Sequence, residues 1–197
     1  MGVYVDNLII TGGDMEVLER FKMEMSKNFK MSNLSVLSYY LGIEVQQSTA
    51  DITIYQGMYV KKLMDIAELA DSKRTRTPME AWFQLRKAST TTAVDATNYR
   101  SIVESLCYLV NTRPNLAYFI GYVNRFMKAP REEHLVAIKR ILRYVAGTRC
   151  WGVRYCAGRG KKKLELVGYN DSDMASDVDD RKSISGIIYF LLGGAIC

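Results

Sequence analysis

A change of hydrophobic period constrains the fold of this 197-residue chain more than any other feature. Residues 97–146 carry apolar side chains at the spacing of three successive helices, whereas residues 164–169 and 184–192 have the character of β-strands. Further strand-like runs precede the helices. Strands and helices that are segregated along a chain in this way predict an α+β fold. On the last predicted helix, the apolar stripe consists of Leu135, Ile138, Leu142 and Val145.

Residues 1–79 are predicted to form a small sheet with two helices. Two β-prone runs flank the turn formers Asp6 and Asn7, a pattern typical of a hairpin with a type I′ turn. Asp14 follows a pair of glycines and has a side chain that can cap a helix. The elements expected in this region are strands at 3–5, 8–11, 39–47 and 52–55, a helix ending near Asn28, and a helix at 56–69.

Residues 80–96 have no sustained period and include a run of Ser and Thr, so they are predicted to form a mobile linker. Three helices are expected after this linker. Asp95 or Thr97 can cap the first helix, and Pro114 suits the first turn of the second. The predicted helices span 97–112, 114–127 and 131–146, and Gly147 is expected to stop the last one.

Positive charge is concentrated in and just after the helical region. Residues 111–163 contain 13 Lys or Arg and two acids, whereas the chain from Leu164 onward contains six acids and only two cations, Arg181 and Lys182. A basic stretch attracts nucleic-acid phosphates because binding releases their counterions. On composition alone, a solvated helix face is the alternative interpretation.

Membrane insertion and secretion are not expected for this chain. It has no run of about eighteen apolar residues, and its first residues lack the basic and apolar regions of a signal peptide. Its cysteines have no CxxC spacing, which favours reduced thiols in an intracellular protein of the cytoplasm or nucleus. His134 is the only histidine, so no His-based metal site or triad is expected, and we expect it on a helix surface.

Several motifs resemble those of copia-type reverse transcriptases. Residues 4–12 (YVDNLIITG) are similar to the YVDD hairpin of that family, and residues 40–45 (YLGIEV) and 112–115 (TRPN) follow in the family's order. Residues 168–173 (GYNDSD) and 179–183 (DDRKS) look like the start of the family's ribonuclease H. Because the match is colinear over nearly the whole chain, the resemblance implies a fragment of a copia-type retrotransposon polyprotein.

The resemblance also implies how the α+β fold is divided. A partial reverse-transcriptase palm sheet is followed by a helical thumb, and the thumb by an incomplete ribonuclease H-like β-sheet. The expected parts are a partial palm at 1–79, a linker at 80–96, thumb-like helices at 97–150 and a truncated ribonuclease H-like segment at 151–197.

The resemblance places remnants of the family's catalytic carboxylates at Asp6 for the polymerase and Asp171 for the ribonuclease H. Both reactions use two metal ions held by several carboxylates. Asn7 stands where the second acid of the hairpin is expected, and a neutral amide oxygen does not balance the charge of a hard cation. We therefore expect no required cofactor, and only weak binding of any Mg²⁺ at these two positions.

Nucleic-acid binding is the function that the resemblance leaves to this chain, with an RNA–DNA hybrid or a duplex as the partner. The thumb-like helices are expected to contact phosphates without reading the bases, and residues 41–44 correspond to the region that grips the primer. The expected contacts are Arg113, Arg125, Lys128, Arg131, Lys139, Arg140 and Arg143 on the helices, and Leu41, Gly42, Ile43 and Glu44 in the primer-grip-like segment.

The first hypothesis is therefore a noncatalytic reverse transcriptase and ribonuclease H fragment with weak, sequence-tolerant nucleic-acid binding. The alternative is a host-adopted interaction or regulatory module whose exposed sheet edges recruit a protein partner or a second copy of the chain. A third hypothesis is RNA-directed DNA polymerase activity completed by residues supplied in trans.

Overall fold

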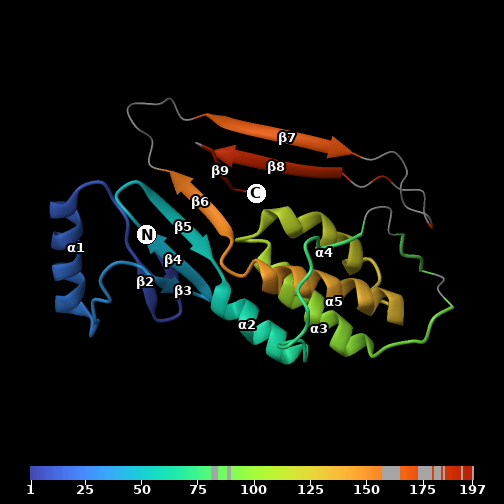
Figure 1. The fold of residues 1–197 in the computed structure, drawn as a ribbon. Helices are drawn as coiled ribbons and strands as arrows, with labels where there is room; N and C mark the ends of the chain where they lie inside the picture. The colour runs from blue at the N-terminus through green and yellow to red at the C-terminus, as the bar shows by residue number, and fades with distance from the viewer. Residues whose placement is uncertain are drawn as a thin grey trace. The chain divides into compact units, whose positions relative to one another are not determined.

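The computed structural model describes residues 1–80, 84–87, 90–156, 165–172, 179, 183, 185–191 and 193–196. Helices and antiparallel sheets occur together in this part of the chain, so the fold is α+β, as predicted (Figure 1). The chain divides into two compact units, Met1–Ser38 and Tyr39–Cys197. This division differs from the predicted boundary after residue 79, because residues 39–79 belong to the same unit as the later helices and strands.

The first unit contains β1 (Gly2–Tyr4), β2 (Asn7–Ile9) and α1 (Met15–Asn28). Tyr4 pairs with Asn7, so the two-residue turn consists of Val5 and Asp6. The predicted turn at Asp6 and Asn7 is therefore wrong by one residue. Only Val5 of the two turn residues has a positive φ, 48°, and a type I′ turn needs two. Asp14 caps α1 as predicted, since its carboxylate accepts hydrogen bonds from the first backbone amides of the helix.

A four-stranded antiparallel sheet opens the second unit, in the order β3 (Tyr39–Tyr40), β4 (Ile43–Gln47), β5 (Asp51–Tyr55) and β6 (Gly152–Cys156). β6 lies in the segment 151–197, which was assigned to a separate sheet, yet it pairs with β5 along its whole length. The predicted boundary at residue 150 is therefore wrong. Sequence analysis missed β6 because only Val153 among its five residues is buried, which leaves little hydrophobic signal.

A second hairpin lies within the run 39–47, which was predicted as a single strand. Tyr40 pairs with Ile43, and the two turn residues between them, Leu41 and Gly42, have φ of 50° and 80°. Two positive φ values are the signature of a type I′ turn, and glycine adopts such a conformation without steric cost. The predicted primer-grip-like segment therefore includes this turn.

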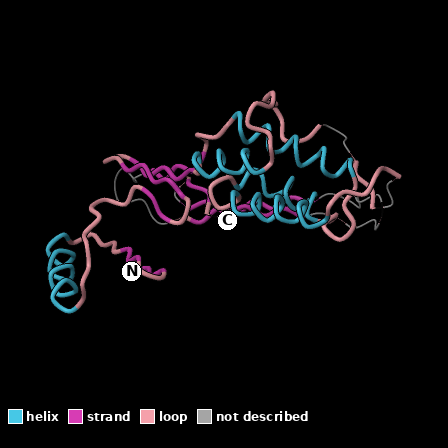
Figure 2. The backbone as a smooth tube through the Cα atoms, turned by 90° about the horizontal axis from the view of Figure 1, so that it is seen from below, coloured by secondary structure: helices cyan, strands magenta, loops and turns pink. Residues whose placement is uncertain are grey.

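Between β5 and β6 the chain forms α2 (Gly57–Ile66), α3 (Ala96–Leu109), the short 3₁₀ helix η1 (Pro114–Leu116), α4 (Ala117–Asn124) and α5 (Glu132–Gly147). Figure 2 shows these helices gathered in one region of the second unit. Their buried side chains form a common core, in which Tyr99, Leu106 and Leu116 have no exposed surface. Of the stripe predicted on α5, Ile138 and its two C-terminal partners are fully buried, while Leu135 is half-buried.

The described part of segment 80–96 packs on the helices and does not separate domains. The Leu85 side chain is buried, and its backbone N–H donates a 2.9 Å hydrogen bond to the hydroxyl of Tyr122 on α4. Val94 N–H bonds to the carbonyl of Pro130, just before α5. One apolar side chain and a few backbone hydrogen bonds therefore connect these residues to the helical core, and the mobility of the segment stays a prediction.

The last sheet consists of β7 (Leu166–Ser172), β8 (Ser185–Leu191) and β9 (Gly194–Ala195), in that order. The two longer strands were predicted, and they pair in antiparallel register. The hydroxyl of Tyr155 on β6 donates a 2.8 Å hydrogen bond to the carbonyl of Ala195, so this sheet contacts the four-stranded one. Most of the predicted acidic turn at 171–180 lies outside the described residues.

Candidate nucleic-acid interface

The two predicted metal-binding carboxylates belong to different compact units of the chain. Asp6 is exposed in the turn between β1 and β2, with Asn7 on the following strand. Asp171 belongs to β7 and pairs with Gly186 on β8, and its side chain lies outside the described residues. Among the side chains that the structure describes, no three His, Cys, Asp or Glu residues form a group that could hold a metal ion.

The primer-grip-like residues contact the neighbouring helices. The carbonyl of Leu41 accepts a hydrogen bond from the hydroxyl of Tyr108 on α3, and Gly42 lies against the same ring. The Glu44 carboxylate accepts a 2.7 Å hydrogen bond from the backbone N–H of Met58, in the first turn of α2. Glu44 therefore caps α2, a task that the side chain of Gln56 at the N-cap position does not perform.

Arg113 was predicted to contact phosphate, but it is buried, with 3% of its surface exposed. Its guanidinium donates hydrogen bonds of 2.9 and 3.0 Å to the carbonyl and hydroxyl of Thr148, at the end of α5. It also lies 5.7 Å from the ring centre of Tyr144 and 5.8 Å from that of Trp151. Burial lowers the pKa of this guanidinium. Arg113 thus fastens the end of α5, and the prediction of a phosphate contact is wrong.

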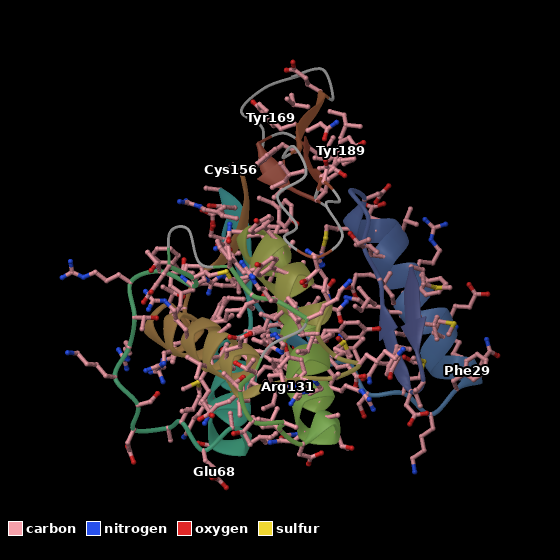
Figure 3. The ribbon with its side chains drawn as sticks, turned by 90° about the vertical axis from the view of Figure 1, so that its right-hand side faces the viewer. Phe29, Glu68, Arg131, Cys156, Tyr169 and Tyr189 are labelled. Atoms are coloured by element: carbon pink, nitrogen blue, oxygen red, sulfur yellow. The ribbon has the colours of Figure 1, made fainter. Side chains whose placement is uncertain are left out.

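Arg131 and Arg140, which were also predicted to contact phosphate, form hydrogen bonds to loops of the chain. Arg131 precedes α5 and donates a 3.2 Å hydrogen bond to the carbonyl of Thr91 (Figure 3). Arg140 pairs with Glu80 at 2.5 Å and donates a 3.1 Å hydrogen bond to the hydroxyl of Thr77, while 28% of its side chain stays exposed. These contacts orient both guanidinium groups toward the chain itself.

The other four predicted cations form the best candidate for a nucleic-acid surface. Lys128 and Lys139 are exposed, and Arg143 is half-buried. Lys139 and Arg143 are four residues apart and therefore lie on one face of α5, where the Arg143 Nε donates to the Lys139 carbonyl at 3.2 Å. Arg125 lies 5.9 Å from the ring centre of Tyr122. The sequence could not separate these residues from Arg113, because burial depends on tertiary packing.

His134 was expected on a helix surface, but it is fully buried. Its Nδ1 accepts a 2.9 Å hydrogen bond from the backbone N–H of Arg131, so the proton resides on Nε2, which donates to the carbonyl of Arg86 at 3.0 Å. The ring stacks on Phe126 with 4.1 Å between centres. Burial lowers the pKa of this imidazole, which is therefore neutral in the folded chain.

Lowering the pH is expected to destabilise the helical region through His134. Unfolding releases the imidazole to water, where its pKa returns to the ordinary value of about 6.5, so the unfolded chain takes up a proton before the folded chain does. This contribution to stability is complete above pH 6.5 and is lost as the pH falls through the lower pKa of the folded state. Urea midpoints at about pH 7.5 and 5.5 should differ less for His134→Gln than for the unaltered chain. An equal difference in both proteins would contradict the prediction.

The described helices and sheets therefore define an α+β protein with cations on part of its helical surface. No described helix is long and apolar enough to cross a membrane. Residues 1–81 match the family described as reverse transcriptase (RNA-dependent DNA polymerase). No solved structure matches the chain.

The curated relatives make the family specific. Over 191 residues, 97% of this chain, it is 39% identical to the Pol polyprotein from transposon RE1 of Arabidopsis thaliana, and it covers 13% of that protein. It is 34% identical to the Pol polyprotein from transposon TNT 1-94 of Nicotiana tabacum, over 98% of this chain and 15% of that protein. An uncharacterized mitochondrial protein of Arabidopsis thaliana is 31% identical, over 96% of this chain and 77% of that protein. The chain belongs to the copia-type retrotransposon Pol polyprotein family, as the sequence resemblance predicted.

Proposed function

We propose that these 197 residues form a reverse-transcriptase-derived module that binds RNA–DNA hybrid or duplex weakly and catalyses neither polymerisation nor RNA cleavage by itself. The observation that carries the binding proposal is the face of α5 that presents Lys139 and Arg143. Phosphates are the partner that such cations attract, and contacts of this kind carry no base information. Family membership supports the choice of nucleic acid over other polyanions.

The noncatalytic part of the proposal rests on Asp6 and Asn7. Transfer of a nucleotide needs two metal ions with their charge balanced by several carboxylates. In the hairpin of this chain, an amide occupies the position next to the single carboxylate. Mg²⁺-dependent primer extension by the purified chain that is abolished by Asp6→Ala, or hybrid cleavage abolished by Asp171→Ala, would overturn this part. Extension that appears only with an added partner would favour the hypothesis of completion in trans.

Substitution of Lys139 and Arg143 together by glutamine should weaken hybrid binding and flatten its salt dependence. Each phosphate contact contributes about 0.9 to the slope of log affinity against log salt, so two lost contacts should reduce the slope by about 2. Fluorescence anisotropy with a labelled hybrid, at about 50 to 200 mM salt, measures both quantities. The matched control is Lys27→Gln with Lys30→Gln, which removes two exposed cations of the first unit. Equal effects in the two double variants would argue against the α5 face.

A protein-interaction role is the second candidate, and the edge strand β7 favours it. β7 is seven residues long and pairs on one side only among the described strands. It exposes Leu166 at 60% and Tyr169 at 62%, and Ile187 on the neighbouring strand is also exposed. Tyr169 is labelled in Figure 3. Long apolar edges recruit further strands from a partner or from a second copy. Light scattering after size exclusion would detect self-association, which Tyr169→Lys should abolish if β7 mediates it.

A further inference from the structure

The structure contains a small basic cavity in the second unit, at a place that sequence analysis did not single out. Its volume is about 190 Å³, and α2, the loop after it and the end of α5 line it. Pockets for drug-sized ligands begin at roughly 300 Å³, so this cavity suits a single small group. Its polar lining consists of Lys61 and Asp65 on α2, Ser72 and Arg74 in the loop, and Arg149 after α5.

The end of α2 explains how these residues converge. Glu68, labelled in Figure 3, has a φ of 55°, the left-handed conformation that ends helices. The N–H of Leu69 donates a 2.9 Å hydrogen bond to the carbonyl of Met64. The chain turns here and returns past α5. A Cβ added to Gly147 would lie 3.4 Å from the Cβ of Arg74, which places the Arg74 stem against the last turn of α5.

The charge of the lining favours an anion. Three cations, Lys61, Arg74 and Arg149, outnumber the single carboxylate of Asp65. All three are exposed, and none forms an ion pair in the part of the chain that the structure describes. Lys61 and Asp65 are one helical turn apart, but with the lysine on the N-terminal side, the less favourable order for pairing. The two guanidinium groups therefore remain available for hydrogen bonds to an oxyanion.

Ser72 supplies a second and independent observation. Ser72 lines the cavity, and its hydroxyl is shielded from bulk solvent and has no hydrogen-bond partner among the described residues. A shielded hydroxyl without a partner destabilises a fold, so such a group calls for an explanation. If the Ser72 side chain rotates to another staggered rotamer that turns the hydroxyl toward the cavity, an oxyanion there would supply the missing acceptor. Val60 and Met64 form the apolar part of the cavity wall.

We propose that this cavity binds one phosphate group through Arg74, Arg149 and Lys61, with the hydroxyl of Ser72 as an additional donor. Tetrahedral oxyanions match the planar donor fork of arginine, and the size of the cavity matches a single such group. The phosphate belongs either to a free phosphomonoester or to a nucleic-acid backbone. The phosphate site does not depend on Lys139 and Arg143 on α5. Phosphate binding at the cavity can therefore be absent while hybrid binding persists, and hybrid binding can be absent while the cavity binds phosphate.

The test is a titration of the ¹⁵N-labelled full chain with sodium phosphate, against sodium chloride of equal ionic strength, followed by amide chemical shifts. Saturable shifts at Ser72, Arg74 and Arg149 are expected with phosphate only. Arg74→Gln combined with Arg149→Gln should weaken binding at least about tenfold, because two charge-assisted contacts are lost. Lys62→Gln combined with Lys73→Gln, which removes two exposed neighbours outside the cavity, should change the affinity less than about twofold.

Ser72→Ala keeps the test informative if the arginine variants fold poorly. This change removes an unpartnered hydroxyl, so thermal stability should not fall, while phosphate affinity should drop about threefold. Competition identifies the source: displacement of phosphate by adenosine 5′-monophosphate but not by adenosine indicates a phosphomonoester, and displacement by hybrid indicates the backbone. Shifts that rise linearly, or that spread over all cations and respond equally to both double variants, would overturn the proposal.

Discussion

Arg113→Ala is expected to lower the free energy of unfolding of the second unit by about 3 kcal/mol, since hydrogen bonds from a charged donor contribute about 1.5–3 kcal/mol and truncation also leaves a cavity. The guanidinium holds the carbonyl and the hydroxyl of Thr148 and lies over two aromatic rings. Without it, the last turn of α5 loses its fastening to the start of η1. Urea unfolding monitored by far-UV circular dichroism measures the change.

Arg113→Lys should recover little of this stability, because an ammonium cannot reproduce the planar fork that reaches both Thr148 atoms. Arg143→Ala is the matched control. Its guanidinium makes one local bond to the carbonyl of Lys139 and is half exposed, so its removal should change stability by less than about 0.5 kcal/mol. For hybrid binding the larger effect should come from Arg143→Ala: under conditions in which both variants fold, Arg143→Ala should bind the hybrid more weakly than Arg113→Ala. Equal stability of the two variants would contradict the assigned role of Arg113.

Gly152→Ala is expected to separate β6 from β5. A Cβ at this position would lie 1.9 Å from the carbonyl oxygen of Ile54 and 2.8 Å from the Cβ of Tyr55, and neither backbone nor Cβ atoms can rotate away. Overpacking against such atoms costs about 3 kcal/mol or more. Hydrogen exchange should therefore report lost protection along the β5–β6 ladder.

Gly186→Ala provides the control for this substitution. Gly186 also lies in a strand, but nothing within 4 Å would meet an added Cβ. Its replacement should leave hydrogen exchange in the β5–β6 ladder unchanged. Preserved protection at Arg154 in Gly152→Ala would show that β6 does not require close approach to β5, and would contradict the pairing.

Short-range signals in the sequence predicted the helices well. Asp14 and Asp95 cap α1 and α3 through bonds to amides two or three residues away, and Pro114 opens η1, where its missing N–H costs nothing. The same kind of signal failed for β6. Its pairing with β5 joins residues about a hundred positions apart, and a five-residue strand with one buried side chain has no distinctive pattern.

The candidate interface divides in the same way. The family resemblance placed Arg113 and Arg143 in one set of expected phosphate contacts, because both are cations of the thumb-like region. Tertiary packing separates them, since one guanidinium enters the space between α5 and the approach to β6 and the other remains at the surface. His134 was likewise expected at the surface, but tertiary packing buries it as a neutral ring with both nitrogens hydrogen-bonded.

The amino-acid sequence by itself determined the α+β class, the order of most helices and strands, and membership of the copia-type family, because these depend on local periodicity, capping residues and ordered motifs. Only the tertiary structure decided which cations are buried, that β6 is the fourth strand of the β3–β6 sheet, and that Lys61, Arg74 and Arg149 line one cavity. These outcomes depend on contacts between residues far apart in the chain. Burial and pairing partners at such distances are set by how the whole unit packs, and no local pattern encodes them.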